Sequence, residues 1–194
     1  MSQRVYSLFQ RSIEAKMNVG EELAPVIEYA ADRIVQALLE EKKVLVCGNG
    51  PSAALSQIFA SNLIDRFEKE RPSLPAIWLG SNMASYTAIV ADAHHNDVYA
   101  KPIRALGQAG DILVVISTSG NAGNLLQAIS SARDRGVDVI ALTGRDGGDI
   151  STMLAPEDIE LRARVDSRSR IHEIHLLVLF CLCDLIDNKL FGID

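Results

Sequence analysis

Two short loops in this 194-residue chain carry residue types that can bind an anion. The first is 47–52 (C-G-N-G-P-S) and the second is 117–121 (S-T-S-G-N), and each lies between an apolar run and a helical pattern. A helix N-terminus offers unpaired N–H groups and the positive end of the helix dipole, and hydroxyl side chains add donors. The loops therefore predict a phosphate-binding site. Its candidate residues are Asn49, Ser52, Ser117, Thr118, Ser119 and Asn121.

Both loops also have an interpretation that needs no ligand. Ser and Asn are common helix N-caps, so either loop taken alone can serve only to begin a helix. Two such loops at adjacent strand ends favour binding over capping. A nucleotide site is disfavoured, because the first loop is not a G-x-G-x-x-G sequence and no P-loop lysine follows it.

The elements that must position these loops alternate between strands and helices. Apolar runs predict strands at 44–50, 75–80, 111–117 and 137–144, and the alternating segment 158–164 predicts an edge strand. A helical region over 5–39 comes first, with a break expected near Gly20 or Pro25. A helix over about 169–190 comes last.

This alternation predicts an α/β fold with a parallel sheet and helices on both faces. We expect a single domain over 1–194, with N-terminal helices in 1–40 and the α/β core and C-terminal helix in 41–194. The N-terminal helical arm has little of its own chain to cover. In a small protein such an arm often packs against a partner subunit.

Composition excludes several classes of protein. The formal net charge is -6, which argues against direct DNA binding, since affinity for DNA depends on basic residues. The spacing of the three cysteines, Cys47, Cys181 and Cys183, does not match a disulfide framework. We therefore expect them to be reduced, buried thiols. Neither a signal peptide nor a membrane-spanning segment is predicted, so we expect a cytoplasmic protein with no membrane partner.

Five motifs spread along almost the whole chain carry a family resemblance. They are C-G-N-G-x-S, R-P-S-L-P-A-I, S-T-S-G-N, L-T-G-R-D-G-G and R-I-x-E-I-H. Together they resemble the branch of the SIS-domain family that holds bacterial phosphoheptose isomerases and DnaA initiator-associating (DiaA) proteins. The resemblance implies a flavodoxin-like five-stranded parallel sheet and a homotetramer assembled partly through the terminal helices. It also implies a sugar phosphate held between the two loops, with Asp92 as a further contact.

The isomerases of this branch use a zinc site, and the resemblance locates its four ligand positions here. In the isomerases, a His and a Glu one turn apart bind zinc, and these positions correspond to Ile58 and Asn62 in this chain. A Gln and a His on the final helix of the isomerases correspond to His172 and Phe180. Ile58 and Phe180 can neither bind zinc nor move a proton, and Asn62 has no carboxylate. We therefore expect no catalytic residue and no cofactor, with zinc only if isomerase activity is retained.

The phosphate site is also weaker than in the isomerases. Pro51 replaces a glycine and removes a backbone donor, and Ala122 replaces a hydroxyl residue. We expect the other histidines, His94, His95 and His175, to be solvated or to lie in the core or at a subunit interface. A rebuilt site from His172 and His175 is an alternative that the spacing leaves open.

The ending C-L-C-D-L-I-D-N-K-L-F resembles the DiaA proteins. This implies a non-catalytic tetramer that binds the initiator DnaA and promotes its assembly at the chromosomal origin, with Leu190 and Phe191 as matching surface positions. On residue type alone, this apolar pair is a partner anchor if exposed, or packs back onto the protein. Two alternatives remain: a phosphoheptose isomerase acting on sedoheptulose 7-phosphate, and a sensor that binds a sugar phosphate without converting it.

Overall fold

The computed structural model describes residues 2–92 and 95–192. Its centre is a five-stranded sheet with the order β2-β1-β3-β4-β5, and all its pairings are parallel. The strands are β1 (Val44–Gly48), β2 (Ala76–Trp78), β3 (Ile112–Ile116), β4 (Asp138–Gly144) and β5 (Ile159–Ala163). The predicted flavodoxin-like α/β fold is confirmed, as is the edge position of the last strand.

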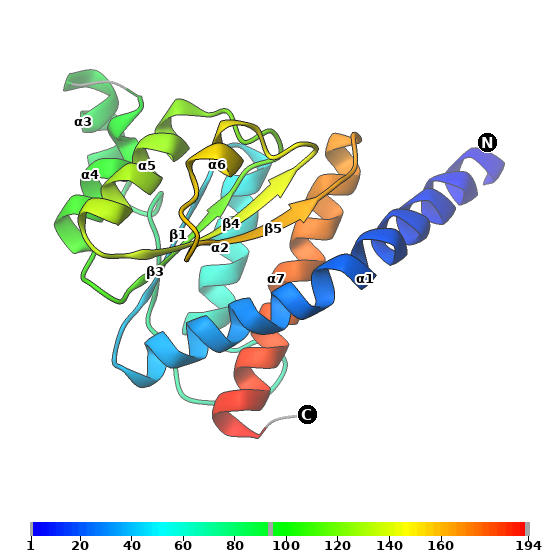
Figure 1. The fold of residues 1–194 in the computed structure, drawn as a ribbon, viewed down its shortest axis with the longest axis horizontal. Helices are drawn as coiled ribbons and strands as arrows, with labels where there is room; N and C mark the ends of the chain where they lie inside the picture. Colours follow the sequence, from blue (N-terminus) through cyan, green and yellow to red (C-terminus); the bar gives the residue numbers. More distant parts are fainter. Residues whose placement is uncertain (1, 93–94, 193–194) are drawn as a thin grey trace.

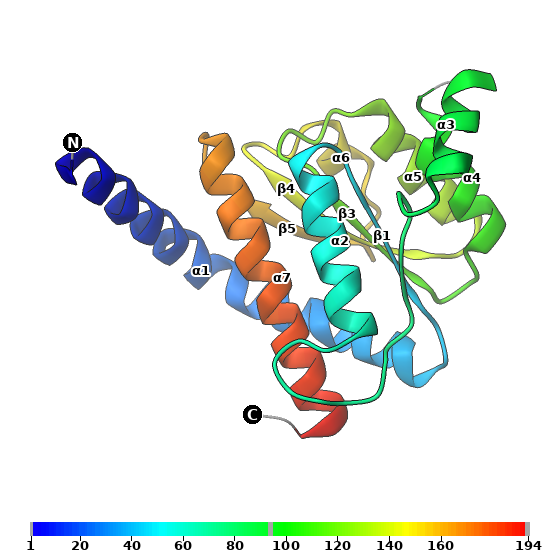
Figure 2. The same cartoon turned by 180° about the vertical axis from the view of Figure 1, so that it is seen from behind.

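Helices cover both faces of the sheet (Figures 1 and 2). They are α1 (Ser2–Leu39), α2 (Pro51–Ile64), α3 (Met83–Asp92), α4 (Asp97–Leu106), α5 (Gly123–Asp134), α6 (Gly148–Met153) and α7 (Arg168–Phe191). One hydrophobic cluster packs α1, α2 and α7 against one face of the sheet. A second cluster packs α3, α4, α5 and α6 against the opposite face. The two outer layers enclose strands that are buried on both sides.

The alternation of side chains along the inner strands explains why both faces are apolar. In β1, Val44 and Val46 belong to the first cluster, whereas Leu45 and Cys47 belong to the second. Successive residues of a strand point to opposite faces, so a continuous apolar run suits a strand covered on both sides. Cys47 and Cys183 are buried free thiols, as predicted, and Cys181 is half-buried.

The predicted break in the N-terminal region is wrong, because α1 is one continuous helix with Pro25 inside it. Pro25 lies on the exposed side of α1, next to solvent-exposed Glu21 and Glu22. The carbonyl that loses its hydrogen bond to the proline is that of Glu21, and water can pair with it there. The first half of α1 projects beyond the body of the molecule in both ribbon views (Figures 1 and 2).

Two helices were not predicted from the sequence. The segment that forms α4 is amphipathic, with Val98, Tyr99 and Ile103 on its buried side, but it contains Pro102. The other helix, α6, has only six residues and follows a glycine pair. Both matter for function, because α4 carries Tyr99 and α6 begins beside the second loop.

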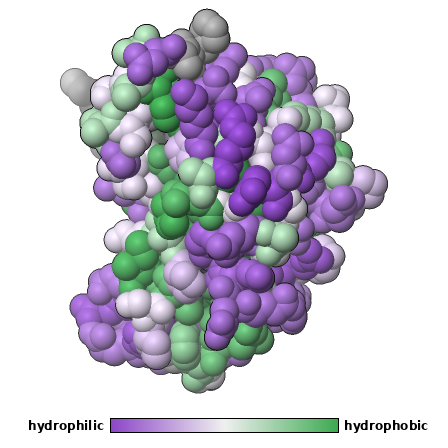
Figure 3. Space-filling model, turned by 90° about the vertical axis from the view of Figure 1, so that its left-hand side faces the viewer, coloured by the Kyte–Doolittle hydropathy of each residue, from purple (hydrophilic) through white to green (hydrophobic). Residues whose placement is uncertain are grey.

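The sheet edge opposite β5 is formed by β2, which has only three residues and follows Pro75. Cavities of about 370 and 320 Å³ flank it and share Ile77, Trp78 and Ser81. The space-filling view of the side that carries α3 and α4 shows apolar side chains gathered between larger hydrophilic areas (Figure 3). A short edge strand limits unwanted strand pairing.

Within the described part of the chain, no helix is long and apolar enough to cross a membrane.

Candidate phosphate loops and the replaced metal site

The first loop turns tightly from β1 into α2. Gly50 has φ +55° and precedes Pro51, the first residue of α2. A Cβ on Gly48 would lie 2.7 Å from the carbonyl oxygen of Ser52, so the close approach of the two backbones requires glycine. The N–H of Ser52 donates to the carbonyl of Asn49 at 3.0 Å. This donor was expected to be free, so the loop offers an anion fewer N–H groups than predicted.

The second loop is fixed to the turn that follows β4. Gly120 has φ +73°, and a Cβ there would lie 1.9 Å from the carbonyl oxygen of Gly147. The Ser117 hydroxyl accepts a hydrogen bond from the Gly120 N–H at 3.0 Å, and the Asn121 side-chain oxygen accepts one from the Asp149 N–H at 2.8 Å. Two predicted ligand-binding side chains therefore also shape the loop. Thr118 and Ser119, between them, are half-buried.

The two loops meet, as their positions after adjacent strands predicted. Gly48 and Ile116 are paired at the ends of β1 and β3. Beyond this pair, the side-chain amides of Asn49 and Asn124 exchange two hydrogen bonds of 2.8 Å. Both polar atoms of Asn49 are thus engaged within the protein, which restricts its predicted role as a ligand contact.

A small polar cluster above this amide pair was not predicted. The Tyr99 hydroxyl donates to the Gly48 carbonyl and lies 3.4 Å from the Asn49 side-chain oxygen. The Asn124 amide nitrogen lies 3.2 Å from His95 Nε2. Burial raises the pKa of the Tyr99 hydroxyl, which keeps it protonated and able to donate. Asn124 lies three residues after the S-T-S-G-N motif, and this proximity is the only signal the sequence offered.

The remaining predicted contacts lie in different surroundings. Asp92 ends α3 and is exposed to solvent. His94 lies outside the described residues. The other candidates are buried: Ser52 in the first turn of α2, and Ser117 directly after β3.

The four positions that match zinc ligands lie on α2 and α7. Ile58 is 38% exposed, and Phe180 packs on Phe67 with ring centroids 5.6 Å apart. Asn62 is half-buried. Two apolar side chains and a neutral amide do not fit a zinc ion. Across residues 2–92 and 95–192, no group of three or more His, Cys, Asp or Glu side chains is placed to hold a metal.

Among the described residues, no third ligand joins His172 and His175 in a metal site. The ring of His175 is buried, and its Nε2 lies 2.8 Å from the Thr143 carbonyl oxygen. Burial lowers the pKa of His175 to about 4, so the ring is neutral at physiological pH. Both ring nitrogens of His172 are buried without a hydrogen-bond partner in the described structure. Burial, reinforced by Arg168, lowers the pKa of His172 as well.

Leu190 and Phe191 are the last two residues of α7 and are both half-buried. They pack against the hydrophobic cluster that joins α1, α2 and α7 to the sheet, and each keeps part of its surface exposed. Lys189 forms an ion pair with Asp32 of α1 at 2.8 Å. The end of α7 is therefore held on the body of the protein.

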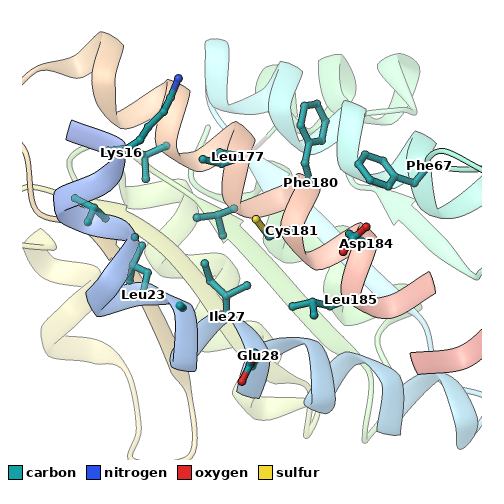
Figure 4. A pocket seen from close by; sticks show the side chains of 15 residues that line it. Lys16, Leu23, Ile27, Glu28, Phe67, Leu177, Phe180, Cys181, Asp184 and Leu185 are labelled. Atoms are coloured by element: carbon teal, nitrogen blue, oxygen red, sulfur yellow. The ribbon is translucent and has the colours of Figure 1, made fainter. Parts of the chain in front are cut away.

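An apolar groove of about 480 Å³ runs between α1 and α7 (Figure 4). Leu23 and Ile27 of α1 and Leu177 and Leu185 of α7 line it. Lys16, Glu28 and Asp184 are the charged residues at its borders. Leu177 is 44% exposed, so this chain alone leaves part of the groove uncovered.

Comparisons with known proteins place the fold and its motifs in one family. The SIS-domain family model matches residues 8–144. A phosphoheptose isomerase of Chromohalobacter salexigens is 52% identical over 189 residues, covering 97% of this chain and 96% of the relative. The DnaA initiator-associating protein DiaA of Escherichia coli is 48% identical over 191 residues, covering 98% and 97%.

A solved structure agrees with these relatives. The phosphoheptose isomerase of Francisella tularensis has a TM-score of 0.93 and 44% identity, covering 96% of this chain and 98% of the other. The two named functions lie at nearly equal distance from this sequence. The chain belongs to the SIS-domain family, in the branch that contains phosphoheptose isomerases and DiaA proteins.

Proposed function

We propose that this protein is a non-catalytic SIS-domain scaffold of the cytoplasm, a single-domain homotetramer that binds DnaA and promotes its assembly at the chromosomal origin. The observation that carries this proposal is the composition of the four zinc-ligand positions. Ile58, Asn62 and Phe180 supply neither a metal ligand nor an acid–base group for an enediol reaction. The relative named DiaA, 48% identical along almost the whole chain, supports the choice of partner.

The surface of α1 supports assembly into an oligomer. The projecting half of α1 exposes Tyr6, Phe9, Ile13 and Met17, each at least 61% exposed. Contiguous apolar surface of this kind usually contacts another protein. Residues 2–18 carry three basic and one acidic side chain, whereas 19–39 carry four acidic and one basic. Two copies of α1 packed antiparallel would therefore match in charge, and the groove between α1 and α7 continues the same apolar surface.

Multivalency supplies the mechanism of the scaffold. Each subunit of a tetramer presents one Leu190–Phe191 surface, so four weak contacts act on one DnaA assembly. Linked contacts of this kind raise avidity by about 10²–10⁴ through effective concentration alone. The half-exposed state of both side chains suits this role, since the remaining surface of each can be covered by a partner.

Surface plasmon resonance with immobilised DnaA tests the proposal. We expect Leu190→Ala and Phe191→Ala each to weaken binding at least tenfold, a typical loss at an interface hot spot. Leu39→Ala is the matched control, since Leu39 is a large apolar side chain exposed at the other end of α1. Light scattering verifies that the variants remain tetramers. Full DnaA binding by a folded Leu190→Ala, Phe191→Ala double variant overturns the assigned surface.

One observation favours a second function, a sugar-phosphate sensor. The two strand-end loops are held together by the Asn49–Asn124 pair, and the second loop is fixed by Gly120 and Asn121. Thr118 and Ser119 lie between these fixed points with side chains that are not fully buried. Calorimetry with phosphosugars tests this role, which is compatible with DnaA binding.

A further inference from the structure

A cavity of about 370 Å³ lies between the edge strand β2 and the helices α3 and α4, and the proposed function does not use it. It lies on the side of the molecule where apolar side chains gather between hydrophilic areas (Figure 3). Its described lining residues include none from the two phosphate loops or from the Leu190–Phe191 surface. Its volume falls within the range of small-molecule sites, about 300–1,000 Å³.

The walls of this cavity are apolar. Ile77 belongs to β2 and Leu79 follows that strand, while Ile89 comes from α3 and Val98 and Leu106 come from α4. Leu79, Ile89 and Val98 are buried, whereas Leu106 is 46% exposed. The apolar lining therefore extends from the core to the surface. A ligand with an apolar body would gain free energy by covering it.

The polar groups of the lining offer hydrogen-bond donors and one positive charge. Lys101 of α4 is the only charged residue among the described lining residues. It is exposed, and within the part of the chain that the structure describes its ammonium group makes no hydrogen bond or ion pair. The Asn82 side-chain oxygen accepts from the Ser85 N–H at 3.0 Å, which leaves the Asn82 amide group as a donor. One cation without a lining carboxylate favours a ligand with a single negative charge.

The cavity on the other side of β2 has the opposite charge. Its volume is about 320 Å³, and Asp65 is the only charged residue among its described lining residues. An anionic ligand is therefore favoured by the cavity beside Lys101 and disfavoured by the one beside Asp65. The charge of the ligand decides which side of β2 it binds.

We propose that the cavity between β2, α3 and α4 binds a medium-chain carboxylate, with its carboxylate group on Lys101 and its hydrocarbon chain against Ile77, Leu79 and Val98. A ligand rich in hydroxyl groups is disfavoured, because the apolar walls would leave those groups without hydrogen-bond partners. Each methylene group that the cavity buries strengthens binding about fourfold. The site is independent of DnaA binding and of any ligand at the two loops.

Trp78 makes binding in this cavity directly measurable. It is the only tryptophan of the chain, and it is one of the lining residues. Its indole ring lies against Gly80, where a Cβ would come within 2.6 Å of a ring atom. The described residues that line the apolar groove between α1 and α7 do not include Trp78. A change in its emission therefore separates a ligand beside β2 from one in that groove.

Tryptophan fluorescence titrations of the full chain test the proposal with octanoate, octanol and octylamine. These probes have chains of equal length and a negative, a neutral and a positive head group. Octanoate produces a saturable change in Trp78 emission and binds about fivefold tighter than octanol, as one exposed ion pair allows. Octylamine binds more weakly than octanol. Hexanoate, which is two methylene groups shorter, binds about tenfold more weakly than octanoate.

Two results of these titrations would overturn the proposal. One is the absence of a saturable emission change with octanoate. The other is equal affinity for octanoate and octylamine, which would mean that the cavity does not select a negative charge.

Variants assign the carboxylate to Lys101 and the chain to the cavity. Lys101→Met removes the charge but keeps an apolar stem, so it weakens octanoate binding about fivefold and leaves octanol binding unchanged. Lys42→Met is the matched control, because Lys42 precedes β1 and does not line the cavity. It leaves both affinities unchanged.

Ala105→Phe fills the cavity from an exposed position on α4 and weakens both octanoate and octanol about tenfold or more. Circular dichroism and the melting temperature verify that this variant is folded. Wild-type octanoate affinity in Lys101→Met, or in folded Ala105→Phe, contradicts the assignment of the ligand to this cavity.

Discussion

The side chains at Ile58, Asn62 and Phe180 bear most directly on function at the scale of single residues. Phe180 rests on Phe67, which lies on the segment after α2. A zinc ligand in place of Phe180 would lose this contact without completing a metal site, because Ile58 and Asn62 would remain.

His175 predicts how stability depends on pH. Its pKa is about 4 in the folded protein, against about 6.5 for an exposed histidine in the unfolded chain. As the pH falls through 6.5, the unfolded chain binds a proton that the native state does not. The part of the unfolding free energy that depends on a neutral His175 is fully present above pH 6.5 and is lost as the pH falls toward 4. The loss reaches about 2 kcal/mol at pH 5.

Urea unfolding at pH 7.5 and pH 5.0 measures this effect. We expect His175→Gln to show a smaller drop in unfolding free energy between the two pH values, because glutamine does not titrate. The difference between the drops of the wild-type and variant proteins isolates His175 from the carboxylates, which titrate in both. An equal drop in the two proteins rules out a buried, neutral His175.

We expect the removal of one buried charged side chain, Arg71, to lower the unfolding free energy strongly. It pairs with Asp187 of α7 at 3.0 Å and donates to the carbonyls of Asn62 and Leu63 near the end of α2, with 1% of its side chain exposed. We expect Arg71→Ala to lower the unfolding free energy by about 3–5 kcal/mol, since Asp187 is left buried and unpaired.

The matched control for Arg71 is Arg66→Ala. Arg66 pairs with Glu70 on the surface, and we expect its removal to cost less than about 1 kcal/mol. Chemical denaturation of both variants makes the comparison. Similar losses in the two proteins would show that Arg71 does not clamp α2 to α7.

At the scale of elements, the site depends on close backbone contacts. Gly50 and Gly120 both have a positive φ, but only Gly120 lies against another backbone. We expect Gly50→Ala to cost about 1–2 kcal/mol from left-handed strain alone. Gly120→Ala adds a clash with Gly147 and should cost clearly more. Thermal unfolding compares the two, and equal losses would mean that the contact between the second loop and the turn after β4 is not tight.

The strands and the meeting of the two loops were predictable because their physical signal is local. Apolar runs identified four strands and an alternating pattern identified β5, and parallel strands bring their carboxyl ends together. The effect of proline on the helices was less predictable. Pro25 was expected to divide α1 but lies on a solvent-exposed side, and Pro102 concealed α4. A proline interrupts a helix only where the surroundings cannot satisfy the freed carbonyl, and that depends on tertiary structure.

The positions of Ser52 and Ser117 in the two loops were predictable, but the hydrogen-bond partners of the loops were not. Ser52 lies buried in the first turn of α2, and Ser117 lies buried directly after β3. The engagement of both polar atoms of Asn49 by Asn124 was not foreseen, because it joins residues 75 positions apart.

At the scale of the whole molecule, α1 predicts assembly. The exposed apolar side chains of its projecting half have no cover within the described chain, and the groove beside α7 is open. We expect the double substitution Phe9→Glu, Ile13→Glu to lower the oligomeric mass measured by light scattering, because it puts charge into an apolar interface. Gln3→Glu, Asn18→Glu adds the same charge at exposed polar positions and serves as the control. If both double variants keep the wild-type mass, this face of α1 is not the interface.

The measurement that separates the two nearest functions is an isomerase assay with sedoheptulose 7-phosphate and added zinc. A phosphoheptose isomerase run in parallel under the same conditions provides the positive control. With Ile58, Asn62 and Phe180 at the metal-ligand positions, we predict no turnover above the buffer background at any zinc concentration. Turnover that rises with zinc and stops with a chelator would contradict the central claim that this SIS-domain protein is a scaffold and not an enzyme.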